Sequence, residues 1–267
     1  MQDLRQIFDA SCLRDPSGTR HVHKPRTTGN TMVMDKGLGL NAFRDLLEIS
    51  HAYIDFIKLG FGTAVLTPPQ ILQTKIELCT QYNVNLYFGG TLFEIAYQSN
   101  LVRDYFNIIK NMKLKWVEIS DGTITIPIYE RNEMIKYATD HGLQVITEVG
   151  KKDKNQALQL DEMIDLYHRD LHSGASFVII EGRESGIDVG VYDKYGDISI
   201  RDIEKCKQQM DMAIVFWEAP LKSQQIALIQ SLGPLLNFGN ISPTDIFSIE
   251  SLRRGLRSDT YHLVQRV

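Results

Sequence analysis

The sequence predicts a single-domain (β/α)8 barrel, a TIM barrel, spanning residues 1–267. Three observations predict it. The chain has 267 residues, of which 43% are hydrophobic, and this is enough for one large core. Eight short apolar segments follow one another along the chain, and residues with helical patterns separate them. Regular alternation of strands and helices favours a parallel sheet, and eight repeats favour its closure into a barrel.

The predicted strands are near-continuous apolar runs, as expected for strands that are buried on both faces. In chain order they cover residues 31–36, 53–59, 85–89, 115–120, 144–149, 176–181, 213–218 and 235–239. Residues 1–30 precede the first strand and form an N-terminal extension.

The predicted helices occupy the gaps between these strands. Three of them end at a glycine, the residue favoured just past the C-terminal end of a helix. These three cover residues 126–141, 160–173 and 221–232, and residues 41–52, 68–82, 92–112 and 199–210 fill the other gaps. An open doubly wound sheet is the alternative fold, but no GxGxxG motif follows the first strand.

Composition excludes several classes of function. The formal net charge is −4 and Lys and Arg are spread along the chain, so neither nucleic acid nor a membrane surface is an expected partner. Residues 1–29 lack the apolar segment of a signal peptide, and no apolar run approaches the length of a membrane span. Cys12, Cys79 and Cys206 are far apart in sequence, which is typical of thiols in a reducing compartment. We therefore expect a cytoplasmic protein.

Carboxylates stand at the C-terminal ends of the predicted strands, where barrel enzymes place their chemistry. Glu118, Glu148, Glu181 and Glu218 follow apolar blocks on four successive strands. Carboxylates at that depth require counter-charges or a metal, and oxygen ligands suit Mg²⁺. The predicted Mg²⁺ ligands are Glu148, Glu181, Glu118 and Asp121.

Cationic and small polar residues accompany these carboxylates. Lys151, Lys58 and Arg183 are the predicted catalytic residues, because they can bind an anion or move a proton. Two segments suit a phosphate: the loop 182–186, and the turn after the last strand, where Ser242 is expected to cap a short extra helix. The predicted substrate- and phosphate-binding residues are Lys36, Ser185, Gly186, Lys222, Asn240 and Ser242.

Several of these segments resemble the phosphosulfolactate synthase family. The strings that carry the resemblance are ITEVGKK (146–152), FVIIEGRESG (177–186), FWEAPLKSQQ (216–225) and IESLRRGLRSDT (249–260), supported by LGFGT (59–63), FGGTLFE (88–94) and SDGTI (120–124). The resemblance covers roughly residues 25–262. It implies a (β/α)8 fold and the Mg²⁺-dependent addition of sulfite to phosphoenolpyruvate, which gives (2R)-phospho-3-sulfolactate.

This reaction needs a proton donor on one face of the intermediate. Lys151 is the predicted donor and Lys152 the second choice, provided that the backbone turns at Gly150, because strict alternation from Glu148 would point Gly150 inward. Two other classes of function stay open. One is an aldolase with a Schiff-base lysine, for which Lys58, Lys151 or Lys222 would serve, and the other is a non-catalytic binding protein. We expect a homo-oligomer with small-molecule substrates.

Overall fold

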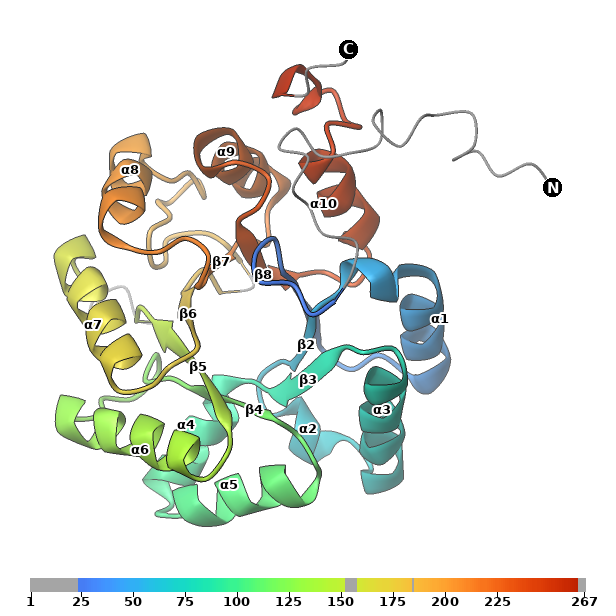
Figure 1. Ribbon diagram of the computed structural model, residues 1–267, viewed down its shortest axis with the longest axis vertical. Helices are drawn as coiled ribbons and strands as arrows, with labels where there is room; N and C mark the ends of the chain where they lie inside the picture. The colour runs from blue at the N-terminus through green and yellow to red at the C-terminus, as the bar shows by residue number, and fades with distance from the viewer. Residues whose placement is uncertain (1–23, 152–157, 184, 264–267) are drawn as a thin grey trace.

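Eight parallel strands surround the centre of the molecule, and helices pack around them (Figure 1). The computed structural model describes residues 24–151, 158–183 and 185–263. The strands are β1 (Thr31–Asp35), β2 (Phe56–Leu59), β3 (Asn85–Phe88), β4 (Trp116–Ile119), β5 (Gln144–Val149), β6 (Phe177–Ile180), β7 (Val215–Glu218) and β8 (Asn237–Ile241). Each coincides with a predicted strand to within a few residues, and the predicted (β/α)8 barrel is confirmed.

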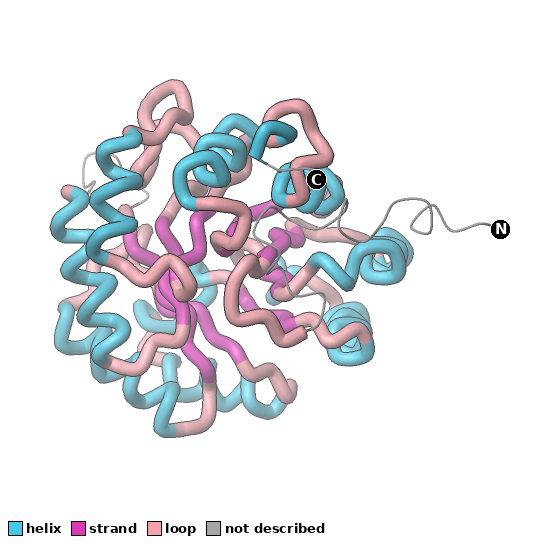
Figure 2. The backbone as a smooth tube through the Cα atoms, turned by 45° about the horizontal axis from the view of Figure 1, so that its top comes forward, coloured by secondary structure: helices cyan, strands magenta, loops and turns pink. Residues whose placement is uncertain are grey.

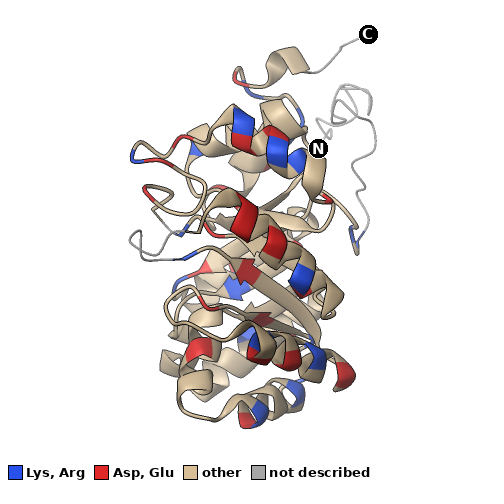
Figure 3. Cartoon of the chain, turned by 90° about the vertical axis from the view of Figure 1, so that its left-hand side faces the viewer, with Lys and Arg blue, Asp and Glu red and all other residues tan. Residues whose placement is uncertain are grey.

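Helices follow most strands and form the outer layer, as the tube in Figure 2 shows. They are α1 (Leu40–Ser50), α2 (Thr63–Leu66), α3 (Pro69–Gln81), α4 (Gly90–Gln98), α5 (Val102–Asn111), α6 (Ile128–Asp140), α7 (Leu160–His172), α8 (Ile200–Gln209), α9 (Lys222–Leu232) and α10 (Ile246–Arg253), with 3-10 turns η3 (His51–Tyr53) and η5 (Tyr261–Leu263). On the side drawn in Figure 3, basic and acidic residues lie close together on the same helices. Within the described residues, no helix combines the length and apolarity needed to cross a bilayer.

Residues 92–112, which fill one of the gaps between predicted strands, form two helices, because the chain turns at Asn100, whose φ is 57°. One prediction of a helix start was wrong: Ser242 was expected to cap the last helix, but α10 begins at Ile246. Ser242 does not cap it, since the Ser242 hydroxyl accepts a hydrogen bond from the Thr244 amide (3.3 Å) and its carbonyl accepts one from Asp245 (2.9 Å), which closes a separate turn. Most of the predicted N-terminal extension, with Cys12, lies outside the described residues.

The sheet is almost, but not fully, closed by backbone pairing. Its strands pair in the order β3-β2-β1-β8-β7-β6-β5-β4, so β3 and β4 are its two edges. We call the gap between these two edge strands the β3–β4 seam. Hydrogen bonds to side-chain carboxylates cross it: the Gly90 amide donates to the Glu118 carboxylate (2.6 Å), and the Ser120 hydroxyl donates to Glu94 (2.6 Å). A side chain on Gly90 would collide with Ser120 and Glu118, so glycine permits this approach.

Candidate active site

Side-chain alternation along the strands builds the site. The inside of the barrel is filled by an apolar cluster that takes one residue from each of seven strands: Met32, Phe56, Tyr87, Trp116, Ile146, Ile179 and Phe216. Successive residues of a strand point to opposite faces, so the residue two positions later also points inward. From β2 and from β4 to β7, these later residues are Lys58, Glu118, Glu148, Glu181 and Glu218. A polar ring therefore lies directly above an apolar floor.

This ring lines a cavity of about 160 Å³ at the C-terminal ends of the strands. The described residues that line it are Met34, Lys58, Phe61, Gly89, Gly90, Thr91, Glu118, Glu148, Glu181, Arg183, Glu218 and Asn240. The expectation that the four glutamates lie at one mouth of the barrel is confirmed.

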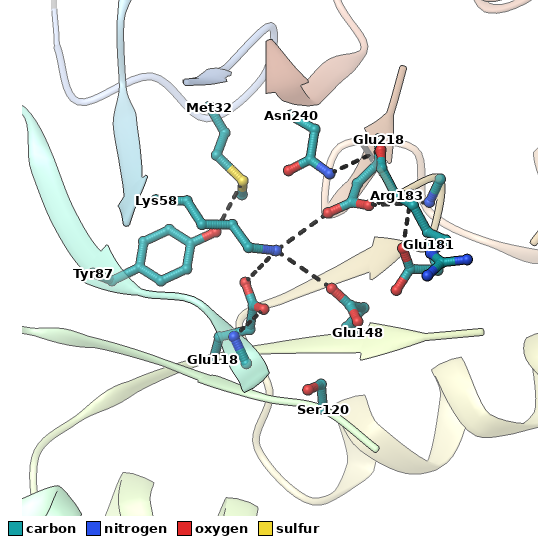
Figure 4. A network of polar contacts seen from close by, with 12 residues as sticks. Met32, Lys58, Tyr87, Glu118, Ser120, Glu148, Glu181, Arg183, Glu218 and Asn240 are labelled. Atoms are coloured by element: carbon teal, nitrogen blue, oxygen red, sulfur yellow. Dashed lines mark hydrogen bonds and ion pairs between the residues drawn. The ribbon is translucent and has the colours of Figure 1, made fainter. Parts of the chain in front are cut away.

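Lys58 is the centre of the ring (Figure 4). Its ammonium lies 3.0 Å from Glu118, 3.2 Å from Glu218 and 3.4 Å from Glu148, and the side chain is 6% exposed. Burial by itself would lower the pKa of Lys58, but the three carboxylates outweigh it and raise that pKa well above its ordinary value. The three carboxylates therefore favour the charged form of Lys58.

Glu118 faces Lys58 from β4. Burial raises the pKa of Glu118 to about 7, with Lys58 opposing the shift and the neighbouring Glu148 and Glu218 adding to it. Glu118 accepts from the Gly90 amide on one oxygen and faces Lys58 with the other. It therefore joins the β3–β4 seam to the ring.

Three carboxylates come close enough to hold one metal ion. Glu148, Glu181 and Glu218 are buried, and one oxygen from each lies within 4.8 Å of the others. Backbone amides orient two of them: the Glu218 carboxylate accepts from Gly182 (3.0 Å) and Arg183 (3.1 Å), and Glu181 accepts from Arg183 (2.7 Å). An all-carboxylate oxygen set fits a hard divalent cation such as Mg²⁺.

Three non-glycine residues of the cavity have a left-handed backbone. Phe61, Arg183 and Asn240 have φ values of 57°, 57° and 55° and follow or end β2, β6 and β8. The Asn240 side-chain amide donates to the Arg183 carbonyl (3.2 Å), which links two of these turns. Such conformations cost free energy and cluster at functional sites.

Lys151 lies beside the cavity and is not among its described lining residues. β5 ends at Val149, and Gly150, with φ of 128°, turns the chain; a Cβ there would lie 2.6 Å from the Cβ of Glu181. The Lys151 ammonium donates to the carbonyls of Asp121 (2.6 Å) and Ile124 (2.9 Å) and to the Asp121 carboxylate (2.8 Å). The turn that the Lys151 assignment required is present, and Lys152 lies outside the described residues.

Arg131, from α6, holds this corner of the site from behind. It is 1% exposed, donates twice to the Asp170 carboxylate of α7 (2.8 and 2.6 Å), and donates to Asp121 (3.0 Å) and to the Glu148 carbonyl (3.1 Å). Asp121, predicted as a metal ligand, thus lies between Arg131 and Lys151. Sequence reasoning missed Arg131, because nothing in a helical pattern distinguishes an inward arginine from a solvated one.

The predicted phosphate-binding residues are spread more widely. Asn240 lines the cavity together with Arg183, one of the predicted catalytic residues, whereas Lys36 and Ser185 are exposed beyond β1 and β6. Lys222 is exposed at the start of α9 and pairs with Asp259 (2.8 Å). The remaining two predicted residues, Gly186 and Ser242, lie in loops outside the cavity lining, and the Gly186 amide donates to the Gly182 carbonyl (3.1 Å).

A family model and the related sequences that the chain resembles all carry the name of the same enzyme. A sequence model of (2R)-phospho-3-sulfolactate synthase (ComA) matches residues 19–259. The chain is 43% identical over 239 residues to a phosphosulfolactate synthase of Methanothermobacter thermautotrophicus, a match that covers 89% of this chain and 93% of the relative. It is 35% identical over 245 residues to the phosphosulfolactate synthase of Bacillus subtilis, covering 91% and 96%.

Solved structures share the fold. Dihydrodipicolinate synthase from Cyanidioschyzon merolae superposes with a TM-score of 0.57 at 6% identity, covering 89% of this chain and 80% of that one. 3-Hexulose-6-phosphate synthase from Salmonella typhimurium superposes with a TM-score of 0.52 at 13% identity, covering 88% and 98%. Likeness at these identities shows the barrel architecture alone.

Proposed function

The chain belongs to the (2R)-phospho-3-sulfolactate synthase family, and from this premise we propose that it adds sulfite to phosphoenolpyruvate to give (2R)-phospho-3-sulfolactate. The observation that carries the proposal is the polar ring over an apolar floor. Among the described lining residues, four carboxylates face only two cationic side chains, Lys58 and Arg183. One divalent cation offsets that difference and allows an anionic substrate to approach.

Mg²⁺ is the proposed cofactor, with Glu148, Glu181 and Glu218 as the residues that would hold it. When bound, Mg²⁺ supplies a Lewis acid that stabilises negative charge on substrate oxygens. Lys58 keeps Glu148 and Glu218 in place through its ion pairs, and the amides of Gly182 and Arg183 fix the Glu218 carboxylate. The side chains of Arg183 and Asn240 are proposed to bind the substrate phosphate at the mouth of the cavity.

The chemistry requires one bond to form and one proton to move. The sulfur lone pair of sulfite attacks C3 of phosphoenolpyruvate, and the π electrons of the C2–C3 bond move toward the carboxylate, which gives an aci-carboxylate. A proton then adds to C2 on one face, and the phosphate ester stays intact. Cationic groups that are already in position lower the barrier, because negative charge grows on the carboxylate oxygens during the attack.

Lys151 is the proposed proton donor. Its ammonium lies 2.8 Å from the Asp121 carboxylate. Its three hydrogen bonds go to the loop between β4 and α6, so proton transfer requires one N–H bond to turn from this loop toward the cavity. The same contacts hold the loop beside the Mg²⁺ ligands.

A Schiff-base aldolase is disfavoured by the state of Lys58. Imine formation needs a neutral amine, whereas the carboxylates around Lys58 raise its pKa well above the ordinary value. Lys222 pairs with Asp259 away from the cavity. The third candidate, Lys151, donates to three acceptors in the loop between β4 and α6. Borohydride in the presence of a carbonyl substrate is expected to leave all three lysines unmodified.

We propose a homo-oligomeric enzyme of the cytoplasm. Cys79 and Cys206 are free and buried, and burial raises the pKa of Cys79 to about 12, which fits unreactive thiols in a reducing compartment. Light scattering tests the oligomer, and cell fractionation tests the compartment; a monomer, or enzyme recovered outside the cytoplasm, contradicts the respective statement.

The experiment that tests the function follows phosphoenolpyruvate by phosphorus NMR during incubation with sulfite and Mg²⁺. A new phosphate monoester is expected only when enzyme, sulfite and Mg²⁺ are all present, and chelation should abolish it. Conversion without sulfite, or release of free phosphate as the main product, contradicts the proposal.

A further inference from the structure

Phe61 is unusual among the residues at the mouth of the cavity. The described lining residues are mostly charged, polar or glycine, and only Met34 and Phe61 are apolar. Met34 is buried, whereas Phe61 is 44% exposed. An exposed aromatic residue is therefore kept in the lining of a cavity in which the other lining residues, apart from the buried Met34, are charged, polar or glycine.

The backbone at Phe61 adds a second observation. Its φ of 57° is in the left-handed region, which is costly for a residue with a bulky side chain. Hydrogen bonds on both sides hold this turn: the Gly60 amide donates to the Asp35 carbonyl (3.0 Å), and the Thr63 hydroxyl donates to the Gly60 carbonyl (2.7 Å). The turn fixes the position of Phe61 between β2 and α2. Glycine would adopt this turn without strain, so the ring itself is the feature that needs an explanation.

We propose that Phe61 is a specificity-determining residue whose ring covers the carbon skeleton of the bound substrate and limits the site to a three-carbon acid. This inference rests on the proposed function. The C2–C3 edge of phosphoenolpyruvate is its apolar part, and its phosphate and carboxylate suit the charged walls. A ring over that edge buries apolar surface and removes water from the reacting carbons.

The test compares the binding of phosphoenolpyruvate with that of 2-phosphoenolbutyrate, which carries one more methyl group on C3. Dissociation constants are measured by calorimetry with Mg²⁺ and without sulfite, for wild type, Phe61→Gly and Phe61→Leu. A pocket wall discriminates one methyl group by about 10–200-fold. Wild type is expected to prefer phosphoenolpyruvate at least tenfold, Phe61→Gly to lose most of that preference, and Phe61→Leu to keep most of it.

Lys113→Gly is the matched control. Lys113 has the same backbone conformation (φ of 60°) but lies in the exposed turn between α5 and β4, outside the cavity lining. Both glycine variants relieve a strained backbone, so neither is expected to lower the thermal midpoint. Only Phe61→Gly is expected to change the binding ratio.

Three results overturn the inference: an unchanged binding ratio in Phe61→Gly, an equal change in Lys113→Gly, or a wild type that binds neither compound. A lower thermal midpoint of Phe61→Gly with an unchanged ratio would make Phe61 a structural residue. The proposed function is judged separately, by turnover of wild type with sulfite. A wild type that binds phosphoenolpyruvate but does not consume it contradicts that function and leaves the binding ratio to decide on Phe61.

Discussion

The ammonium of Lys151 has three acceptors within 2.9 Å, all in the loop between β4 and α6. Loss of a general acid typically slows an enzyme by about 10²–10⁴-fold. We predict that Lys151→Ala still binds phosphoenolpyruvate with Mg²⁺ but turns over at least about a hundredfold more slowly. Calorimetry measures the binding of phosphoenolpyruvate, and steady-state kinetics measures the turnover. Near-normal kcat in Lys151→Ala, with a large loss in Lys58→Ala or Lys152→Ala, would assign the proton to the other lysine.

Arg183 combines a lining position with a strained backbone, and its amide contacts both Glu181 and Glu218. Arg183→Ala keeps the amide and removes the guanidinium. A charge-assisted hydrogen bond contributes about 1.5–3 kcal/mol, so the dissociation constant for phosphoenolpyruvate is expected to rise roughly tenfold or more, with Mg²⁺ affinity little changed. Lys222→Ala is the control, because Lys222 lies outside the cavity lining. Wild-type affinity in Arg183→Ala would show that the phosphate binds elsewhere.

The helices α6 and α7 are joined beneath the site by the buried pair Arg131–Asp170. Removing one partner of a buried ion pair typically costs about 3–5 kcal/mol, because the other charge stays buried. We predict a loss of this size for Arg131→Leu, measured by urea unfolding, and a smaller loss for Arg131→Leu with Asp170→Leu. A loss in the double variant that is larger than the loss in Arg131→Leu would show that the two side chains contribute independently and would contradict this prediction.

The strands and their inward residues could be predicted from sequence, whereas the helix contacts could not. A glutamate near the C-terminal end of an apolar block, as at Glu118, Glu148 and Glu218, predicts both the strand and the depth of the charge, because side-chain alternation depends only on neighbouring residues. Arg131 meets Asp170 across 39 residues, and only the folded arrangement of α6 and α7 creates that pair. Asp121 was predicted as a metal ligand from its strand-end position, but which charge it faces depends on the same long-range packing.

The buried Glu118 carboxyl makes the stability of the barrel depend on pH. The pKa of Glu118 is raised to about 7 in the folded chain, above the ordinary carboxyl value. The folded chain therefore binds a proton at Glu118 more tightly than the unfolded chain does. The stability that Glu118 contributes is complete at pH values below the ordinary carboxyl pKa, and it is lost as the pH rises through about 7. We predict that, without divalent cations, the free energy of unfolding falls across this window more in wild type than in Glu118→Gln.

Mg²⁺ bound to Glu148, Glu181 and Glu218 should oppose this trend, because its positive charge favours the ionised form of the neighbouring Glu118. We expect the rise in thermal midpoint on adding Mg²⁺ to be larger at pH 8 than at pH 5. Calorimetric scans of wild type and Glu118→Gln at both pH values, with and without Mg²⁺, measure both effects. An Mg²⁺ effect that is the same at both pH values would argue that the ring does not bind the ion.

The position of β1 in the sheet has a consequence for how the chain is made. β1 pairs with β2 and with β8, and the Asn30 amide donates to the Asn237 side chain, 207 residues away. A contact across so many residues closes a long loop, which carries an entropic cost, and it cannot form before both strands exist. During synthesis, the backbone groups of β1 that pair with β8 therefore have no strand partner until β8 has left the ribosome. β8 also carries Asn240, so a chain that ends before β8 contains every residue of the apolar floor but lacks one residue of the cavity lining.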